Sequence, residues 1–399
     1  PNDPMNARIY TLENGLKVYM TVNKNQPRIQ TFIAVRAGGK NDPAETTGLA
    51  HYFEHLMFKG TENFGTQDYA KEKPMLDEIE ALFEVYRKTT DEAERTAIYR
   101  KIDSVSYEAS KVAIPNEYDK LMAAIGAVGT NAYTANDMTV YEEDIPSNQI
   151  ENWAKIQADR FQHSVIRGFH TELETVYEEK NMSLTKDDRK VFEQMMAALF
   201  PHHPYGTQTV LGTQENLKNP SITNIKNFFK EWYVPNNMAI CLSGDFEPEM
   251  MIETINRYFG SMKPNPNLPE LKFEAEKPIE APIVKEVVGA EAEFLVLGWR
   301  FPGAASKEAE MLSLLSAILY NGQAGLIDLD INQQQKMLGA GAFPISLADY
   351  SMYLIQGNPK DGQSLEEVRS LLLAEIEKLK NGEFDESLLA ATVNNLKKK

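Results

Sequence analysis

The fold of this chain is organised around one stretch, Gly48-Leu49-Ala50-His51-Tyr52-Phe53-Glu54-His55-Leu56-Met57-Phe58. His51 and His55 are four positions apart, so in a helix they lie one turn apart on the same face. The other residues are largely apolar, which predicts a buried helix. Two imidazoles and a carboxylate in a buried helix need partners, because unpaired polar groups in a core are costly. A metal ion would meet that need, and core histidines satisfied by hydrogen bonds are the alternative.

The pattern His51-x-x-Glu54-His55 is typical of a catalytic zinc site. Neutral imidazoles at this spacing can bind one tetrahedral ion, and catalytic zinc commonly has three protein ligands and one open position. Zinc lowers the pKa of a bound water, and a neighbouring carboxylate can take the water's proton and pass it to a leaving amine. Glu54 is the candidate for this general base.

The spacing leaves the third zinc ligand open. Glu172 and Glu179 are seven positions apart in an acid-rich helix predicted from about 171 to 184, so they share one face. Spacing alone does not choose between them. His202 and His203 lie between prolines in a predicted loop, which makes them weaker candidates.

Composition limits the classes of protein to which the chain can belong. The 399 residues are 42% apolar and 25% charged, which is typical of a globular protein with room for two domains. The net charge of −17 and the lack of a basic patch argue against binding to nucleic acid, and no apolar run is long enough to span a membrane. One cysteine excludes a disulfide scaffold.

The first part of the chain predicts strands and helices in alternation. Asn14-Gly15 is a strong hairpin signal. Thr46 or Thr47 is the expected N-cap of the His51 helix, and Gly60 is placed to end it. Residues 75–112 predict an amphipathic helical hairpin, which we interpret as a solvated surface layer in preference to a partner-binding device. Strands are expected at 8–12, 16–20, 29–36, 131–134, 138–141 and 238–243.

The second part of the chain resembles a partial copy of the first. We expect a first domain over 1–261, a proline-rich linker over 262–282 and a second, truncated domain over 283–399. A segment without histidine, 310–316, stands where the first domain has its His51 helix, so we expect no metal site there. Strands are expected near 284–288, 294–300 and 350–356, and helices near 307–320, 364–380 and 384–396.

Several segments together resemble the pitrilysin (M16) family of metallopeptidases, which includes insulin-degrading enzyme and the mitochondrial processing peptidases. The inverted zinc motif is followed by Leu-Met-Phe-Lys-Gly-Thr, and the likeness covers the first 260 residues most closely. The other matching segments are Asn14-Gly15-Leu16-Lys17-Val18, Gly48-Leu49-Ala50, Asn131-Ala132-Tyr133-Thr134 with Thr139-Val140-Tyr141, Glu172-x6-Glu179 and His203-Pro204-Tyr205-Gly206.

This resemblance implies an α+β fold, with tandem domains in which an antiparallel-rich sheet packs with helices, similar to LuxS and the processing peptidases. It implies one Zn²⁺ in the catalytic domain and a zinc endopeptidase that cleaves peptides or small unfolded proteins. By the family pattern, the zinc ligands are His51, His55 and Glu179, and the general base is Glu54. Glu172 supports the metal ligands without binding the metal itself. Asn131, Ala132 and Tyr133 match the sheet edge to which substrate adds as a strand.

The chain departs from the family pattern in two respects. Glu179 follows His55 at an unusually long interval, which the hairpin at 75–112 explains. Family enzymes also work as two halves, and the arginine and tyrosine of the second half have no match here. We therefore expect a further C-terminal portion, a partner subunit or an oligomer to complete the enzyme. The main alternative is a non-catalytic binding or assembly half, and a zinc hydrolase of non-peptide substrates is a more distant one.

The two ends of the sequence carry expectations of their own. The chain opens at Pro1 without a methionine, so we expect that a leader has been removed and that the protein works in the periplasm or another extracytoplasmic space. It ends in three lysines inside a predicted helix, so we expect the natural protein to continue.

Overall fold

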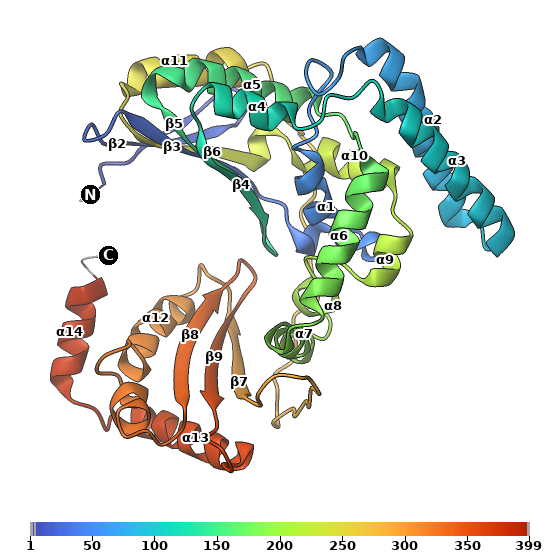
Figure 1. The fold of residues 1–399 in the computed structure, drawn as a ribbon. Coiled ribbons are helices and arrows are strands. Elements are labelled where there is room, and N and C mark those ends of the chain that lie inside the picture. The colour runs from blue at the N-terminus through green and yellow to red at the C-terminus, as the bar shows by residue number, and fades with distance from the viewer. Residues whose placement is uncertain (1–2, 4, 397–399) are drawn as a thin grey trace. The chain divides into compact units, whose positions relative to one another are not determined.

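The structure is a computed structural model that describes residues 3 and 5–396. It has two compact units: an N-terminal unit of Pro1–Ser183 with His202–Ala275, and a C-terminal unit of Leu184–Pro201 with Glu276–Lys399. Each unit combines one sheet with helices (Figure 1). The predicted α+β class is therefore confirmed.

The N-terminal unit is built on a six-stranded mixed sheet. The strand order is β1-β2-β6-β3-β5-β4, in which only β2 and β6 pair in parallel. β4 is therefore the last strand at one edge. The strands are β1 (Arg8–Thr11), β2 (Lys17–Val22), β3 (Arg28–Val35), β4 (Val128–Thr134), β5 (Thr139–Pro146) and β6 (Met238–Gly244).

Alternation of side chains fixes which face of this sheet is buried. Along β3, Ile29, Thr31, Ile33 and Val35 are buried, and the residues between them are half-buried. Because successive side chains point to opposite faces of a strand, this pattern assigns one face of β3 to the core. The predicted hairpin at Asn14-Gly15 joins β1 and β2, and Gly15 has the positive φ of 89° that such a turn favours.

Helices cover the sheet and surround its β4 end. Helices α5 and α11 lie side by side over the sheet, while α1 contacts β4, β5, α6 and α10 (Figure 1). The helices of this unit are α1 (Leu49–Leu56), α2 (Tyr69–Lys88), α3 (Glu92–Ser110), α4 (Glu117–Ala124), α5 (Ile150–His163), α6 (Phe169–Ser183), α8 (Pro204–Thr207), α9 (Gln214–Lys218), α10 (Ile222–Trp232) and α11 (Pro248–Phe259).

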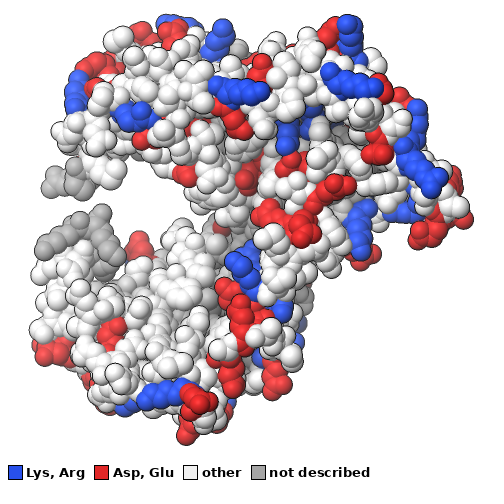
Figure 2. Space-filling view, in the orientation of Figure 1, with Lys and Arg blue, Asp and Glu red and all other residues white. Residues whose placement is uncertain are grey.

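The predicted helical hairpin is present as α2 and α3, although α2 begins earlier than expected. The two helices pack against each other and project from the rest of the unit (Figure 1). Acidic and basic side chains both cover this projection (Figure 2). Its base is anchored by a buried ion pair, in which Arg167 Nε and Nη2 donate to the two carboxylate oxygens of Glu72 at 2.6 and 2.8 Å.

The C-terminal unit has a three-stranded antiparallel sheet in the order β7-β9-β8. Its strands are β7 (Leu295–Pro302), β8 (Gly339–Ser346) and β9 (Tyr350–Asn358), and its helices are α7 (Asp187–Leu199), α12 (Lys307–Leu319), α13 (Leu365–Asn381) and α14 (Glu386–Leu396).

Three features of this unit differ from the expectations. The strand expected near 284–288 is absent, because residues 261–294 contain no helix or strand. β8 was not expected from the sequence. α7 groups with the C-terminal unit, whereas we expected it within a first domain that runs to residue 261.

Across the residues that the structure describes, every helix is too short or too polar to cross a bilayer.

Candidate metal centre and active site

The site is organised by α1, which begins in a tightly packed turn. Gly48 precedes the helix with φ at 86°, and a Cβ there would lie 2.7 Å from the carbonyl oxygen of Leu211. The side chain of Asp42 accepts the N–H groups of Gly48 at 2.7 Å and Ala50 at 2.8 Å. These bonds satisfy N–H groups that have no partner within the first turn of a helix.

This arrangement corrects the expected cap. Thr46 or Thr47 was expected as the N-cap, but Gly48 holds that position and Asp42 provides the capping carboxylate. The Thr47 hydroxyl instead bonds to Asn216 at 2.5 Å. The expected end at Gly60 is also too late, because α1 ends at Leu56.

Helices α1 and α6 together bring three metal-binding side chains into one group. His51 and His55 come from α1, and Glu179 comes from α6. One ligand atom from each of the three lies within 4.8 Å of the others. The Oε2 atom of Glu179 is 3.6 Å from Nε2 of His51 and 3.5 Å from Nε2 of His55. Two imidazole nitrogens and one carboxylate oxygen form a donor set that suits zinc.

Glu172 has different partners, although it lies on the same helix as Glu179. Its Oε1 is 2.7 Å from Nδ1 of His55, and its Oε2 is 2.5 Å from Nζ of Lys59. Burial raises the pKa of Glu172, but these two hydrogen bonds outweigh burial and bring the pKa down to about 2. A carboxylate on Nδ1 leaves Nε2 of His55 directed toward Glu179 and His51.

Glu54 is buried beside the histidines and is held by the edge strand. Its Oε2 accepts the hydroxyl of Thr134, in β4, at 2.5 Å. Burial is the largest influence and raises the pKa of Glu54, whereas the bond from Thr134 and the nearby His55 lower it. Glu54 therefore has a carboxylate that is fixed in position and less acidic than an exposed one.

The expected substrate-binding residues lie on β4. Asn131, Ala132 and Tyr133 pair with Glu142, Tyr141 and Val140 of β5. Because β4 is the last strand in the sheet order, its other edge faces away from the sheet. The Tyr133 side chain is 44% exposed. Thr134, the next residue, carries the contact with Glu54.

The two weaker ligand candidates lie elsewhere. The group of metal-binding side chains among the described residues contains neither His202 nor His203. His203 is buried, accepts the N–H of Tyr205 through Nδ1 at 3.2 Å, and packs against the rings of Tyr205 and Phe273. Its role in the structure is to form the turn that begins α8.

Two family models match the chain. One, described as insulinase (peptidase family M16), matches residues 17–79, and the other, described as the peptidase M16 inactive domain, matches residues 221–396. The chain belongs to the M16 peptidase family. The first match includes α1 with its two histidines. The second begins in the N-terminal unit, just before α10, and extends over most of the C-terminal unit.

Curated relatives of this M16 chain include peptidases from bacteria and mitochondria. The zinc protease PqqE of Helicobacter pylori is 23% identical over an alignment 392 residues long, which covers 95% of this chain and 76% of the relative. A probable mitochondrial-processing peptidase subunit beta of Schizosaccharomyces pombe is 25% identical over 260 residues, 64% of this chain and 45% of the relative. The chain thus spans less than half the length of the second relative.

Solved M16 structures share the fold. A protease from Helicobacter pylori superposes with a TM-score of 0.75 at 22% identity, covering 98% of this chain and 84% of that one. Pitrilysin superposes with a TM-score of 0.67 at 17% identity, covering 97% of this chain but 38% of pitrilysin. The periplasmic protease PqqL from Escherichia coli superposes with a TM-score of 0.66 at 15% identity, covering 98% of this chain and 39% of PqqL.

Sequence reasoning missed three residues that hold this M16 site in place: Asp42, Lys59 and Thr134. Thr134 follows the segment chosen for substrate binding, and Lys59 follows the zinc motif, but neither position carries a spacing signal. Asp42 lies in the loop before α1, where an acidic residue near a helix N-terminus is a recognisable signal.

Proposed function

We propose that this chain is the catalytic part of a zinc endopeptidase that cleaves peptides or small unfolded proteins. The observation that carries the proposal is the convergence of His51, His55 and Glu179, with the carboxylate of Glu54 beside them. The names of relatives such as the zinc protease PqqE support the same reaction class.

The residues present fit a zinc ion. His51 and His55 would each bind it through Nε2, the nitrogen that faces Glu179, and Glu179 would supply a carboxylate oxygen. When bound, zinc supplies a Lewis acid that polarises the scissile carbonyl and makes a water acidic. Glu172 accepts a hydrogen bond from Nδ1–H of His55, which selects the tautomer with a free Nε2 lone pair.

Glu54 is the proposed general base. Its carboxylate takes a proton from the attacking water and later gives it to the leaving amine. Because its pKa is raised by burial, Glu54 can hold this proton between the two steps more readily than an exposed glutamate could. Thr134 keeps one carboxylate oxygen in place during both transfers.

Substrate is proposed to bind as an added strand along β4. Asn131, Ala132 and Tyr133 would pair with the peptide backbone. The next residue of β4, Thr134, bonds to Glu54, so a peptide on this strand would have its scissile bond close to Glu54. Main-chain pairing suits peptides of varied sequence, because every residue offers the same backbone groups.

A second half is proposed to complete the enzyme. The chain covers 45% of one processing-peptidase beta subunit and 38% of the pitrilysin structure, which supports a further C-terminal portion or a partner subunit with the missing arginine and tyrosine. The 76% coverage of PqqE supports a shorter missing portion. The likeness to a periplasmic protease supports an extracytoplasmic location.

Peptide cleavage by the Glu54→Gln variant tests the proposed function. The full-length protein and the variant are compared on an unfolded protein substrate, with Glu178→Gln, an exposed acid beside the ligand Glu179, as the control. We expect Glu54→Gln to keep its zinc and lose at least about a hundredfold in kcat/KM, as general-base removal does. Equal cleavage by the protein and its Glu54→Gln variant would refute the proposal and favour the non-catalytic assembly role.

A further inference from the structure

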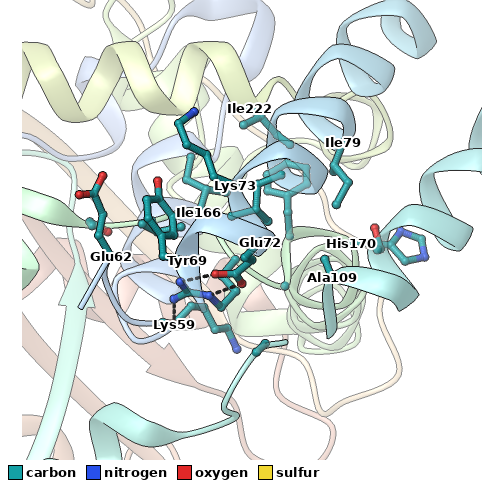
Figure 3. Close-up of a pocket in the computed structure, with 18 of the residues that line it drawn as sticks. Lys59, Glu62, Tyr69, Glu72, Lys73, Ile79, Ala109, Ile166, His170 and Ile222 are labelled. Atoms are coloured by element: carbon teal, nitrogen blue, oxygen red, sulfur yellow. Dashed lines mark hydrogen bonds and ion pairs between the residues drawn. The ribbon is translucent and has the colours of Figure 1, made fainter. Parts of the chain in front are cut away.

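A cavity lies beside the metal centre in the N-terminal unit. It encloses about 670 Å³ between the hairpin α2–α3, helix α10 and residues 162–171 (Figure 3). Ligand cavities in proteins are typically about 300–1,000 Å³, so this one could take a small molecule. Its lining does not include His51, His55 or Glu179.

Much of the cavity wall is apolar. Ile79, Phe169 and Ile222 line it from three different elements, and each is at most 5% exposed to solvent. Glu62 and Tyr69 lie at one end of the view, and Ala109 and His170 at the other (Figure 3). An apolar wall of this kind favours a ligand with a hydrocarbon body.

The charged lining has an excess of positive groups. Five lining residues are basic and three are acidic, in a chain whose net charge is −17. Four of the eight pair within the lining: Arg167 with Glu72, and Lys73 with Asp77. The others are Lys59, Lys226, Lys230 and Glu62.

Lys59 and Lys226 pair with carboxylates outside the lining, Glu172 and Glu80. Two neighbouring lysines of α10, Lys226 and Lys230, lie in this lining. Lys226 and Lys230 are four positions apart, so their side chains lie on one face of the helix. Lys226 also pairs with Glu80 outside the cavity, while the exposed Lys230 makes no ion pair with any residue that the structure describes. A single anionic group placed beside these ammonium groups would be favourably bound.

We propose that this cavity binds a small amphipathic anion, a hydrocarbon body with one carboxylate, for which a medium-chain fatty acid is the simplest example. The hydrocarbon body packs against Ile79, Phe169 and Ile222. The carboxylate lies toward Lys230 of α10, one turn from Lys226, whose charge is already balanced by Glu80. Neither a neutral nor a cationic ligand of the same size gains from Lys230.

The cavity shares part of its wall with the metal centre. Phe53, which lines it, stands between His51 and Glu54 on α1, and Lys59 bonds to the Glu172 that holds His55. A ligand here would therefore pack directly behind the helix that carries the zinc motif. Binding is independent of the proposed peptidase reaction, so the two proposals can fail separately.

Calorimetric titration of the full-length protein with decanoate tests this proposal, without any peptide substrate. Decanol and decylammonium are titrated in parallel, all below their micellar concentrations. We expect one decanoate to bind per chain, about fivefold or more tighter than either analogue, which is the effect of one partly exposed charge pair. Equal affinity for the three compounds, or no saturable binding, would overturn the proposal.

Two variants locate the binding. Lys230→Glu should weaken decanoate binding about fivefold or more, whereas Lys155→Glu, at another exposed lysine on α5, should leave it unchanged. Ala109→Phe should fill the cavity and abolish binding of all three compounds. If Ala109→Phe does not fold, as judged by circular dichroism, the effect of Lys230→Glu alone still tests whether decanoate binds in this cavity. Decanoate binding that is unaffected by Lys230→Glu would place the ligand elsewhere, for example on the zinc ion.

Discussion

At the scale of single residues, Glu172 and Glu179 make two different contacts with His55 from one face of a helix. Both residues come from α6 and both approach His55, but Glu172 contacts Nδ1 and Glu179 faces Nε2. The two carboxylates therefore act on opposite sides of the same imidazole. In the proposed site, Glu172 would orient the ring and Glu179 would share a metal ion with it.

This difference predicts a graded loss of zinc. Glu179→Gln removes a proposed ligand and should cause the greatest loss, while Glu172→Gln should weaken zinc binding about 10–100-fold through the orientation of His55. The exposed Glu178→Gln should bind zinc as the unaltered protein does. Competition with a chromogenic chelator measures the three affinities. A greater loss in Glu172→Gln than in Glu179→Gln would reverse the assignment.

The bond from Thr134 predicts a second residue-scale effect. Thr134→Val keeps the side-chain shape but removes the hydrogen bond to the buried Glu54 carboxylate. A bond to a charged group is worth about 1.5–3 kcal/mol, so kcat/KM should fall about tenfold or more with zinc content unchanged. Thr175→Val, an exposed threonine on α6, is the matched control. Unaltered cleavage by Thr134→Val would remove this threonine from the proposed mechanism.

Sequence spacing could identify only part of this site. His51, Glu54 and His55 follow from a local pattern, because their geometry is set by one helical turn. The choice between Glu172 and Glu179 needed the family resemblance, because both lie on one face of α6. The contact of Thr134 with Glu54 joins residues 80 positions apart, and the sequence contains no local signal for such a contact.

At the scale of elements, α1 is capped by a side chain that lies outside the helix, in the loop before it. Asp42 bonds two N–H groups at the start of the helix from a position in the preceding loop. His51, the first residue of the motif, directly follows Ala50, so it lies in the helical turn that Asp42 caps.

Removal of this cap should affect both stability and metal binding. Asp42→Ala should lower the free energy of unfolding by about 1–2 kcal/mol and also weaken zinc binding. Asp91→Ala removes the equivalent cap of α3, where Asp91 accepts the N–H of Glu94 at 2.8 Å, and should lower stability alone. Urea denaturation and zinc titration of both variants separate the two effects. Equal zinc affinity in the two variants would show that α1 keeps its geometry without Asp42.

The elements that sequence reasoning missed lack the usual periodic signals. β8 reads Gly-Ala-Gly-Ala-Phe-Pro-Ile-Ser, in which small residues and a proline hide the alternation of a strand. The opposite error occurred at 284–288, where Val284 and Val288 are 75% and 93% exposed. A β-branched run predicts a strand, but a strand also needs a partner, and that depends on the tertiary fold.

At the scale of the whole molecule, the candidate site belongs to one unit. Every proposed ligand, the general base and the proposed substrate strand lie in the N-terminal unit. The C-terminal unit also combines one sheet with helices, although its sheet is wholly antiparallel, and it falls largely within the match to the M16 inactive domain.

Zinc should therefore stabilise the two units unequally. A ligand at 100 times its dissociation constant adds about 2.7 kcal/mol to the stability of the state that binds it. Hydrogen exchange with and without zinc should show new protection in α1 and α6, and little change in β9 of the C-terminal unit. Equal new protection in β9 would contradict a site confined to the N-terminal unit.

The most direct test of the central claim is a crystal structure with anomalous data collected on both sides of the zinc absorption edge. We expect one anomalous peak per chain, bound by Nε2 of His51, Nε2 of His55 and a carboxylate oxygen of Glu179, with Glu172 still on Nδ1 of His55. A zinc peak bound by Glu172 in place of Glu179, or no peak at these histidines in zinc-saturated crystals, would contradict it.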